Sequence, residues 1–300
     1  QTKLAEHDMH FPNDVILAMN LDNSQLHDIY HLDLSTRQLT KMAENSGNVV
    51  GWEIDTNLEV RGVFTTGTDG GYEFYIRDNN FEWKLLANWN IEDSQNIGVE
   101  TFSKDNKYVY LRDSRNHNAS RLIKIELETG NSEVIFEDPE YDVNHVMTHP
   151  ESYEPQLISV AKARNETYII DETIMNDVEK VAQLNPGDYV IYDRDNTDKK
   201  WVIGFTEDNA PASFYLYDRV KQKGKLLFYT KPELSNYQLA EMEPFSFTSR
   251  DGLTIHGYIT FPIGLERKNL PMVLNVHGGP WLRDTWGYNP EAQWIANRGY

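Results

Sequence analysis

The residues best suited to chemistry lie near the end of the chain, where His277 is followed by Gly278, Gly279, Pro280 and Trp281. A backbone amide can donate a hydrogen bond to a reacting carbonyl oxygen only if no Cβ blocks the approach and the turn can adopt a positive φ, and glycine meets both conditions. Amides arranged in this way stabilise the negative charge that develops on that oxygen during acyl transfer. The five residues therefore predict an oxyanion-binding loop, and a simple turn without any ligand is the alternative.

Elements on both sides are predicted to position this loop. Before it, residues 272–276 are almost wholly apolar, which is typical of a strand buried on both faces of a parallel sheet. After it, Asn289 is a good N-cap, Pro290 and Glu291 suit the first turn of a helix, and Gly299 can end that helix. Strand, glycine turn and helix in this order resemble the oxyanion loop of an α/β-hydrolase.

A hairpin is predicted ahead of these elements. Residues 250–252 read Arg-Asp-Gly, which favours a tight turn, and residues 253–261 alternate between apolar and polar side chains at a period of two. This pattern indicates an antiparallel strand that precedes the parallel one.

Three segments of this part of the sequence, residues 247–253, 256–258 and 277–281, look like the opening of the catalytic domain of the prolyl oligopeptidase family of serine peptidases. Within that family the resemblance is greatest to the dipeptidyl-aminopeptidase and acylaminoacyl-peptidase branch. The close match covers residues 245–300, whereas the preceding chain resembles the family in architecture only.

The resemblance implies that His277, Gly278, Gly279 and Pro280 form the oxyanion loop. In the prolyl oligopeptidases proper, a tyrosine stands in the place of His277 and its hydroxyl contacts the oxyanion. Because an imidazole occupies that place here, the amide of Gly279 is the better candidate donor. Trp281, next to the loop, is expected to form a wall of the substrate pocket.

The chain itself contains no recognisable nucleophile. A serine hydrolase of this kind needs a Gly-x-Ser-x-Gly turn, and no serine of the sequence has glycines at both flanking positions. The resemblance implies that the catalytic Ser, Asp and His follow after Tyr300. The 300-residue chain is therefore expected to be inactive when it is alone.

No metal or cofactor is expected. His27 and His31 share a predicted strand face but would stand ~13 Å apart, too far for one ion. Residues 193–198 are rich in aspartate, but the positions where a calcium loop requires glycine and glutamate hold Asp198 and Gly204. A hairpin turn is the preferred interpretation of this segment.

Residues 1–231 are predicted to form part of a β-propeller of about five blades. A short apolar or aromatic strand ending in an acid recurs every 45 to 48 residues; the five acids are Asp33, Asp78, Glu126, Asp171 and Asp218. A further strand is predicted before each of these strands and a returning strand after each. Three or four strands at such a period are typical of a propeller, and a multi-sheet sandwich is the alternative.

The fold class that follows is mainly β, with a partial propeller before the first strands and helix of an α/β-hydrolase domain. Residues 1–5 are interpreted as the last strand of an earlier blade. Propellers of the resembled family have seven or eight blades, so the remaining blades are expected before Gln1. Residues 232–244 are predicted to be a charged linker, and residues 245–300 the incomplete N-terminal part of the catalytic domain.

Composition excludes several other classes of function. The net charge of −19 argues against nucleic acid and anionic membrane as partners, because both would be repelled. No apolar run approaches the ~18 residues of a membrane span. The absence of cysteine excludes disulfides and thiolate chemistry, and it is compatible with either the cytoplasm or the periplasm. Composition fits an oligomer as well as a monomer.

The predicted function is that of a fragment of a serine peptidase that hydrolyses short peptides, with the propeller limiting access to the active site. Dipeptidyl-aminopeptidase and acylaminoacyl-peptidase specificities both stay open, since the chain has no adjacent Glu-Glu pair of the kind that binds a peptide ammonium in the dipeptidyl branch. The alternatives are a non-catalytic propeller that acts as a binding module, and an esterase of the α/β-hydrolase class.

Overall fold

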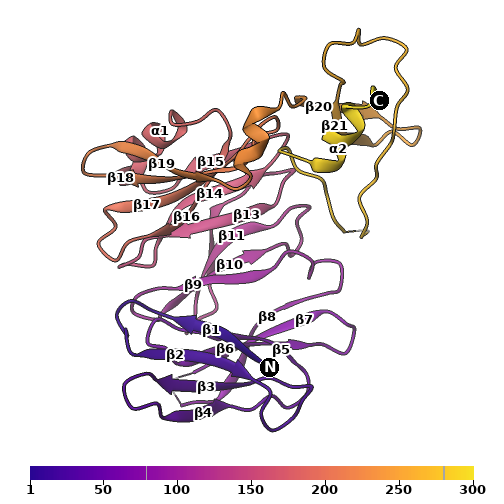
Figure 1. Ribbon diagram of the computed structural model, residues 1–300. Coiled ribbons are helices and arrows are strands. Elements are labelled where there is room, and N and C mark those ends of the chain that lie inside the picture. The colour runs from indigo at the N-terminus through magenta and orange to yellow at the C-terminus, as the bar shows by residue number, and fades with distance from the viewer. Residues whose placement is uncertain (79, 280) are drawn as a thin grey trace. The chain divides into compact units, whose positions relative to one another are not determined.

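The computed structural model describes residues 1–78, 80–279 and 281–300 (Figure 1). These residues divide into two compact units, Gln1–Pro155 and Gln156–Tyr300. Strands make up most of the regular structure in both units. The predicted mainly β class is therefore confirmed.

The described part of the first unit contains three antiparallel sheets of four strands, and in each sheet the strands are neighbours in sequence as well as in space. The first sheet consists of β1 (Thr2–His7), β2 (Asp14–Met19), β3 (Asp28–Asp33) and β4 (Leu39–Ala43). The second consists of β5 (Val49–Ile54), β6 (Val60–Thr66), β7 (Tyr72–Arg77) and β8 (Trp83–Trp89). The third consists of β9 (Gly98–Phe102), β10 (Tyr108–Asp113), β11 (Arg121–Glu126) and β12 (Ser132–Phe136), and β13 (Val143–Thr148) follows it.

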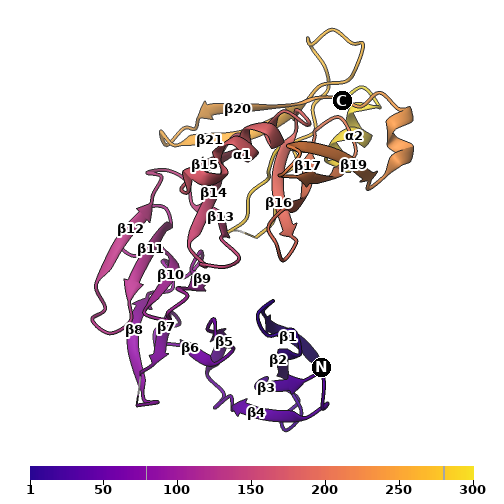
Figure 2. The same cartoon turned by 90° about the vertical axis from the view of Figure 1, so that its left-hand side faces the viewer.

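The second unit begins within β14 (Pro155–Ala161), which pairs with β15 (Asn165–Ile169) in a tight hairpin. The helical segments η1 (Glu172–Ile174) and α1 (Met175–Ala182) come next. A further four-stranded sheet is formed by β16 (Asp188–Arg194), β17 (Lys200–Thr206), β18 (Ser213–Asp218) and β19 (Lys223–Tyr229). The unit ends with η2 (Pro232–Asn236), the two-stranded hairpin of β20 (Met242–Thr248) and β21 (Thr254–Thr260), and α2 (Pro290–Ala296) (Figure 2).

The predicted repeat is confirmed, since the five acids stand at equivalent places. Each lies at or just after the end of the third strand of its repeat, namely β3, β7, β11, β15 and β18. The carboxylate then accepts hydrogen bonds from the following turn, as Asp33 does from the amide of Ser35 at 2.8 Å. Such bonds to the charged form lower the pKa of Asp33, Asp78 and Asp218. The recurring acid is therefore a turn-forming residue.

Two predictions about the strands are wrong. Residues 1–5 are not the last strand of an earlier blade, because β1, which contains most of them, pairs antiparallel with β2 and is the first strand of the first sheet. The fourth repeat has no returning strand after Asp171, because α1 stands in its place. Asp171 caps the helical segment through the amide of Thr173, and Ile174, Val178 and Val181 are spaced so that one helix face is buried.

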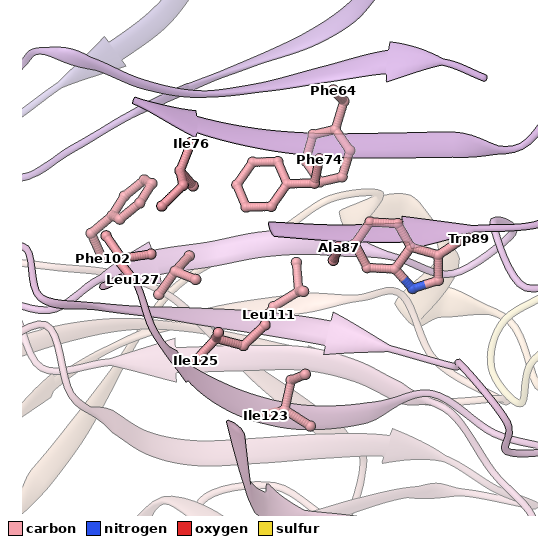
Figure 3. Close-up of a cluster of buried hydrophobic side chains, with 11 residues drawn as sticks. Phe64, Phe74, Ile76, Ala87, Trp89, Phe102, Leu111, Ile123, Ile125 and Leu127 are labelled. Atoms are coloured by element: carbon pink, nitrogen blue, oxygen red, sulfur yellow. The ribbon is translucent and has the colours of Figure 1, made fainter. Parts of the chain in front are cut away.

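The larger of two buried clusters described in the first unit lies between the second and third sheets. Alternate residues of β7 and of β11 point into it, among them Phe74 and Ile76 and, facing them, Ile123 and Ile125 (Figure 3). Phe64 stacks on Phe74 with ring centroids 4.5 Å apart. Burying a side chain of this size stabilises the fold by about 1.5–3 kcal/mol, so face-to-face packing of these sheets contributes to stability.

The segment expected to be a linker, residues 232–244, contains η2 and the first residues of β20. The predicted domain limits, 1–231, 232–244 and 245–300, stay predictions. The hairpin interpretation of residues 193–198 is confirmed, since Asp195 accepts hydrogen bonds from the amides of Lys199 and Lys200 between β16 and β17. Within the described residues, no helix has the length and apolarity needed to cross a membrane.

Candidate functional site

The hairpin ahead of the glycine loop forms as predicted. β20 and β21 pair antiparallel with Thr248 opposite Thr254, and the amide of Ser249 donates to Leu253 O at 2.8 Å across the turn. Gly252 has a φ of +89°, a conformation that glycine adopts without strain. This hairpin delivers the chain to the segment that contains the candidate site.

The strand predicted immediately before the loop is absent. Residues 272–276 have no strand pairing, and Met272 and Leu274 are 78% and 77% exposed. A buried parallel strand requires neighbouring strands at its edges and elements over both faces. The described residues provide neither, so the apolar composition of this run does not produce a strand.

Gly279 has the backbone that the oxyanion interpretation requires. Its φ is +135°, and a Cβ added there would lie 2.9 Å from the amide nitrogen of Trp281. A Cβ added at Gly278 would meet nothing within 4 Å. Glycine is therefore necessary at position 279 for conformation and space, whereas at position 278 there is room for a side chain.

The neighbours of Gly279 are exposed. The imidazole Nδ1 of His277 lies 2.9 Å from the carbonyl oxygen of Gly278, so this ring contacts the loop itself. Trp281, the expected pocket wall, is 77% exposed. Pro280, the remaining residue of the predicted loop, lies outside the described residues. The oxyanion and pocket-wall roles of these residues stay predictions.

The predicted helix after the loop is confirmed as α2. Asn289 caps it by accepting hydrogen bonds from the amides of Glu291 and Ala292, both at 3.0 Å, and Pro290 is its first residue. The Glu291 carboxylate also accepts a 2.9 Å hydrogen bond from the side-chain amide of Asn275. The helix N-terminus thus fixes the chain just before His277.

The chain after the loop is fixed by residues that the sequence did not single out. The guanidinium of Arg283 donates to Ala161 O at 2.6 Å and to Lys162 O at 3.1 Å. Trp286 donates from its indole N–H to Met242 O at 2.9 Å. The acceptors of these hydrogen bonds are backbone carbonyl oxygens, which any residue type provides. The sequence therefore could not predict the contacts of Arg283 and Trp286.

A cleft of about 690 Å³ lies beside α2. Tyr237 and Leu239 contribute to it from the segment after η2, and Tyr288, Trp294 and Arg298 contribute from around the helix. Pro262, Ile263 and Leu265 also line it, whereas none of the described residues 277–279 and 281 does. The cleft is therefore distinct from the glycine loop.

Three comparisons place these features among known proteins. The chain is 32% identical to dipeptidyl aminopeptidase BIII of Pseudoxanthomonas mexicana over 296 residues, which are 96% of the chain and 43% of that protein. The solved structure of a puromycin hydrolase superposes with a TM-score of 0.66 at 14% identity, covering 99% of the chain and 49% of that structure. A prolyl endopeptidase superposes with a TM-score of 0.63 at 13% identity, with coverages of 96% and 44%. No family model matches the sequence.

Successive blade-sized antiparallel sheets define part of a β-propeller, and a hairpin, a glycine loop and a capped helix follow them in the chain. The chain spans less than half the length of the curated relative and of the two solved structures. In sequence the chain is similar to that dipeptidyl aminopeptidase over nearly its whole length, and in fold it is similar to the puromycin hydrolase and the prolyl endopeptidase.

Proposed function

We propose that the chain is part of a serine peptidase that hydrolyses short peptides, of the dipeptidyl-aminopeptidase or acylaminoacyl-peptidase type. The observation that carries this proposal is the alignment with a dipeptidyl aminopeptidase over 96% of the chain, which includes both the propeller repeats and the glycine loop. The conformation of Gly279 supports it, since an amide at a positive-φ glycine is open to a reacting carbonyl.

In the proposed reaction, the amide of Gly279 donates to the carbonyl oxygen of the scissile bond as that oxygen becomes negatively charged. The nucleophilic serine and its acid and histidine partners are contributed by residues that follow Tyr300 in the complete protein. Trp281 forms a wall of the substrate pocket. The propeller repeats restrict access, so that short peptides reach the site and folded proteins do not.

The test uses the complete natural protein that contains this chain. Its hydrolysis of dipeptidyl, N-acylaminoacyl and simple ester chromogenic substrates would be measured before and after treatment with a fluorophosphonate, which phosphonylates serine nucleophiles and releases fluoride. Turnover of peptide substrates that the fluorophosphonate abolishes is the expected result.

Two other outcomes would contradict the proposal. Turnover of esters with no turnover of peptides would indicate an esterase. No turnover of any substrate, with no labelling by the fluorophosphonate, would indicate a propeller that acts as a binding module.

A further inference from the structure

The β14–β15 hairpin is contacted by side chains from several places around the glycine loop. Besides Arg283, Tyr258 of β21 reaches it, donating from its hydroxyl to Ala163 O at 2.9 Å. Arg164 of the hairpin stacks on Trp286, with the guanidinium carbon 3.4 Å from the ring centroid. The tip of a propeller hairpin therefore contacts the chain before and after the glycine loop.

The hairpin is a firm base for these contacts. β14 is almost entirely buried along its length. Arg164 is held in turn by Asp188 of β16, with its Nε donating to Oδ1 at 2.8 Å. A group bound to the carbonyls of residues 161 and 162 is thus attached to the sheet framework, and its position is set by that framework.

We propose that Arg283 is a positioning residue for the oxyanion loop. It stands four places after Gly279, in a stretch where residues 272–276 form no strand and Trp281 is exposed. Its planar guanidinium presents two N–H groups in a fixed geometry, which suits two successive carbonyl oxygens. With Asn275 bound to Glu291 before the loop, Arg283 sets the direction of the Gly279 amide from the other side, and it stands nearer to Gly279 in the sequence than Trp286 does.

This inference rests on the proposed function, and it concerns the rate of the chemical step more than substrate binding. The oxyanion forms only near the transition state, so a misplaced donor lowers kcat and leaves ground-state binding largely intact. A displacement of ~1 Å in a catalytic arrangement can cost about 100-fold in rate.

The experiment compares Arg283→Ala and Arg283→Lys with the complete natural protein. We expect Arg283→Ala to lower kcat by about 10- to 100-fold with little change in KM. Its affinity for a peptide boronate, which forms a tetrahedral adduct, should fall by a similar factor, while its affinity for the product peptide should not. Arg283→Lys should be intermediate, because an ammonium is a point donor and cannot reproduce the fork.

Arg267→Ala is the matched control. Arg267 is also exposed and in the same part of the chain, where it pairs with Glu243 at 2.7 Å, and it lies outside the loop. Rates are expressed per active site, titrated with the fluorophosphonate, so that a merely structural defect lowers the number of sites and leaves turnover per site unchanged.

Wild-type kcat per site in Arg283→Ala, with an active parent protein, would overturn the positioning role alone. An equal loss of kcat in Arg267→Ala would also overturn it. A parent protein that hydrolyses neither peptides nor esters would overturn the proposed function, and the positioning role with it.

Discussion

Adding one methyl group at Gly279 should uncouple catalysis from substrate binding in the complete protein. Alanine keeps the amide N–H, but holding it at a φ of +135° would cost about 1–3 kcal/mol of backbone strain. Its Cβ would also lie 2.9 Å from the amide nitrogen of Trp281 and 3.2 Å from the amide nitrogen of Leu282. The backbone must therefore rotate, and the amide must turn away from its present direction.

The size of the effect follows from what the amide is proposed to do. Loss of one oxyanion donor costs about 3–4 kcal/mol, which corresponds to a fall in kcat of about 10²–10³-fold. Gly279→Ala should approach this loss, and Gly279→Pro, which has no N–H at all, should reach it. Binding of a non-hydrolysable peptide should change much less than kcat.

Two comparison variants separate the causes. Gly278→Ala adds the same methyl group where nothing lies within 4 Å, so its loss of kcat should be much smaller. Gly264→Ala places alanine at a positive φ of +76° away from the loop, and it controls for strain alone.

Steady-state kinetics and a melting curve are measured for every variant. A folded Gly279→Pro protein with near wild-type kcat would refute the reasoning and move the donor role to Gly278 or to the His277 side chain.

Three further predictions concern the 300-residue chain. Purified alone, it should hydrolyse no peptide or ester above background, because no nucleophile of the expected kind is present; turnover that a fluorophosphonate inhibits would contradict this. Asp177→Ala should lower the free energy of unfolding by about 3–5 kcal/mol in urea titrations, because buried Asp177 accepts hydrogen bonds from Tyr217 at 3.0 Å and from Arg219 at 2.9 Å. Glu179→Ala changes an exposed residue of the same helix and is the control. Equal losses in the two variants would contradict the argument. Burial, together with the nearby carboxylates of β1 and β9, raises the pKa of Glu53 to about 8. The folded chain therefore keeps a proton that the unfolded chain loses above about pH 4.5, and the free energy of unfolding should fall as the pH rises from about 4.5 to about 8. Glu53→Gln should flatten that fall, and an unchanged pH profile in this variant would contradict the prediction.

The strands that could be predicted are those with strong local signals. β3 and β18 combine β-branched or aromatic residues with an acid that begins a turn, and this combination identified the third strand of each repeat. The first strands of the other four repeats, β5, β9, β13 and β16, were not predicted. In β9, for example, the residues are partly polar, with Glu100 and Thr101, and only partly buried. Such a strand is defined by its pairing with β10, which the local sequence does not encode.

Helix α1 carried a signal that was available in the sequence. Asp171 as a cap and the spacing of Ile174, Val178 and Val181 are helical features, but the expectation of a returning strand in every repeat took precedence over them. Residues 272–276 show the opposite case, in which a strand-like composition has no partners to pair with.

In the candidate site, too, the features with a local sequence signal were predicted and those that depend on distant contacts were not. A motif identified His277, Gly278 and Gly279, and cap and turn residues correctly predicted α2 and the β20–β21 hairpin. The contact of Arg283 could not be predicted, because its partner at Ala161 is a backbone carbonyl 122 positions earlier. An arginine in an exposed loop has no feature that distinguishes this role from solvation.

The attachment of α1 has a consequence for how this chain can be divided or recombined. The helix follows the fourth repeat in sequence, but Asp177 bonds to Tyr217 and Arg219, which belong to β18 and the turn after it. A cut after Ala182 would leave the helix without these partners and would leave the guanidinium of Arg219 without one of its carboxylates. The fourth and fifth repeats should therefore unfold together in hydrogen exchange, and neither should be replaceable alone by a blade from a related protein.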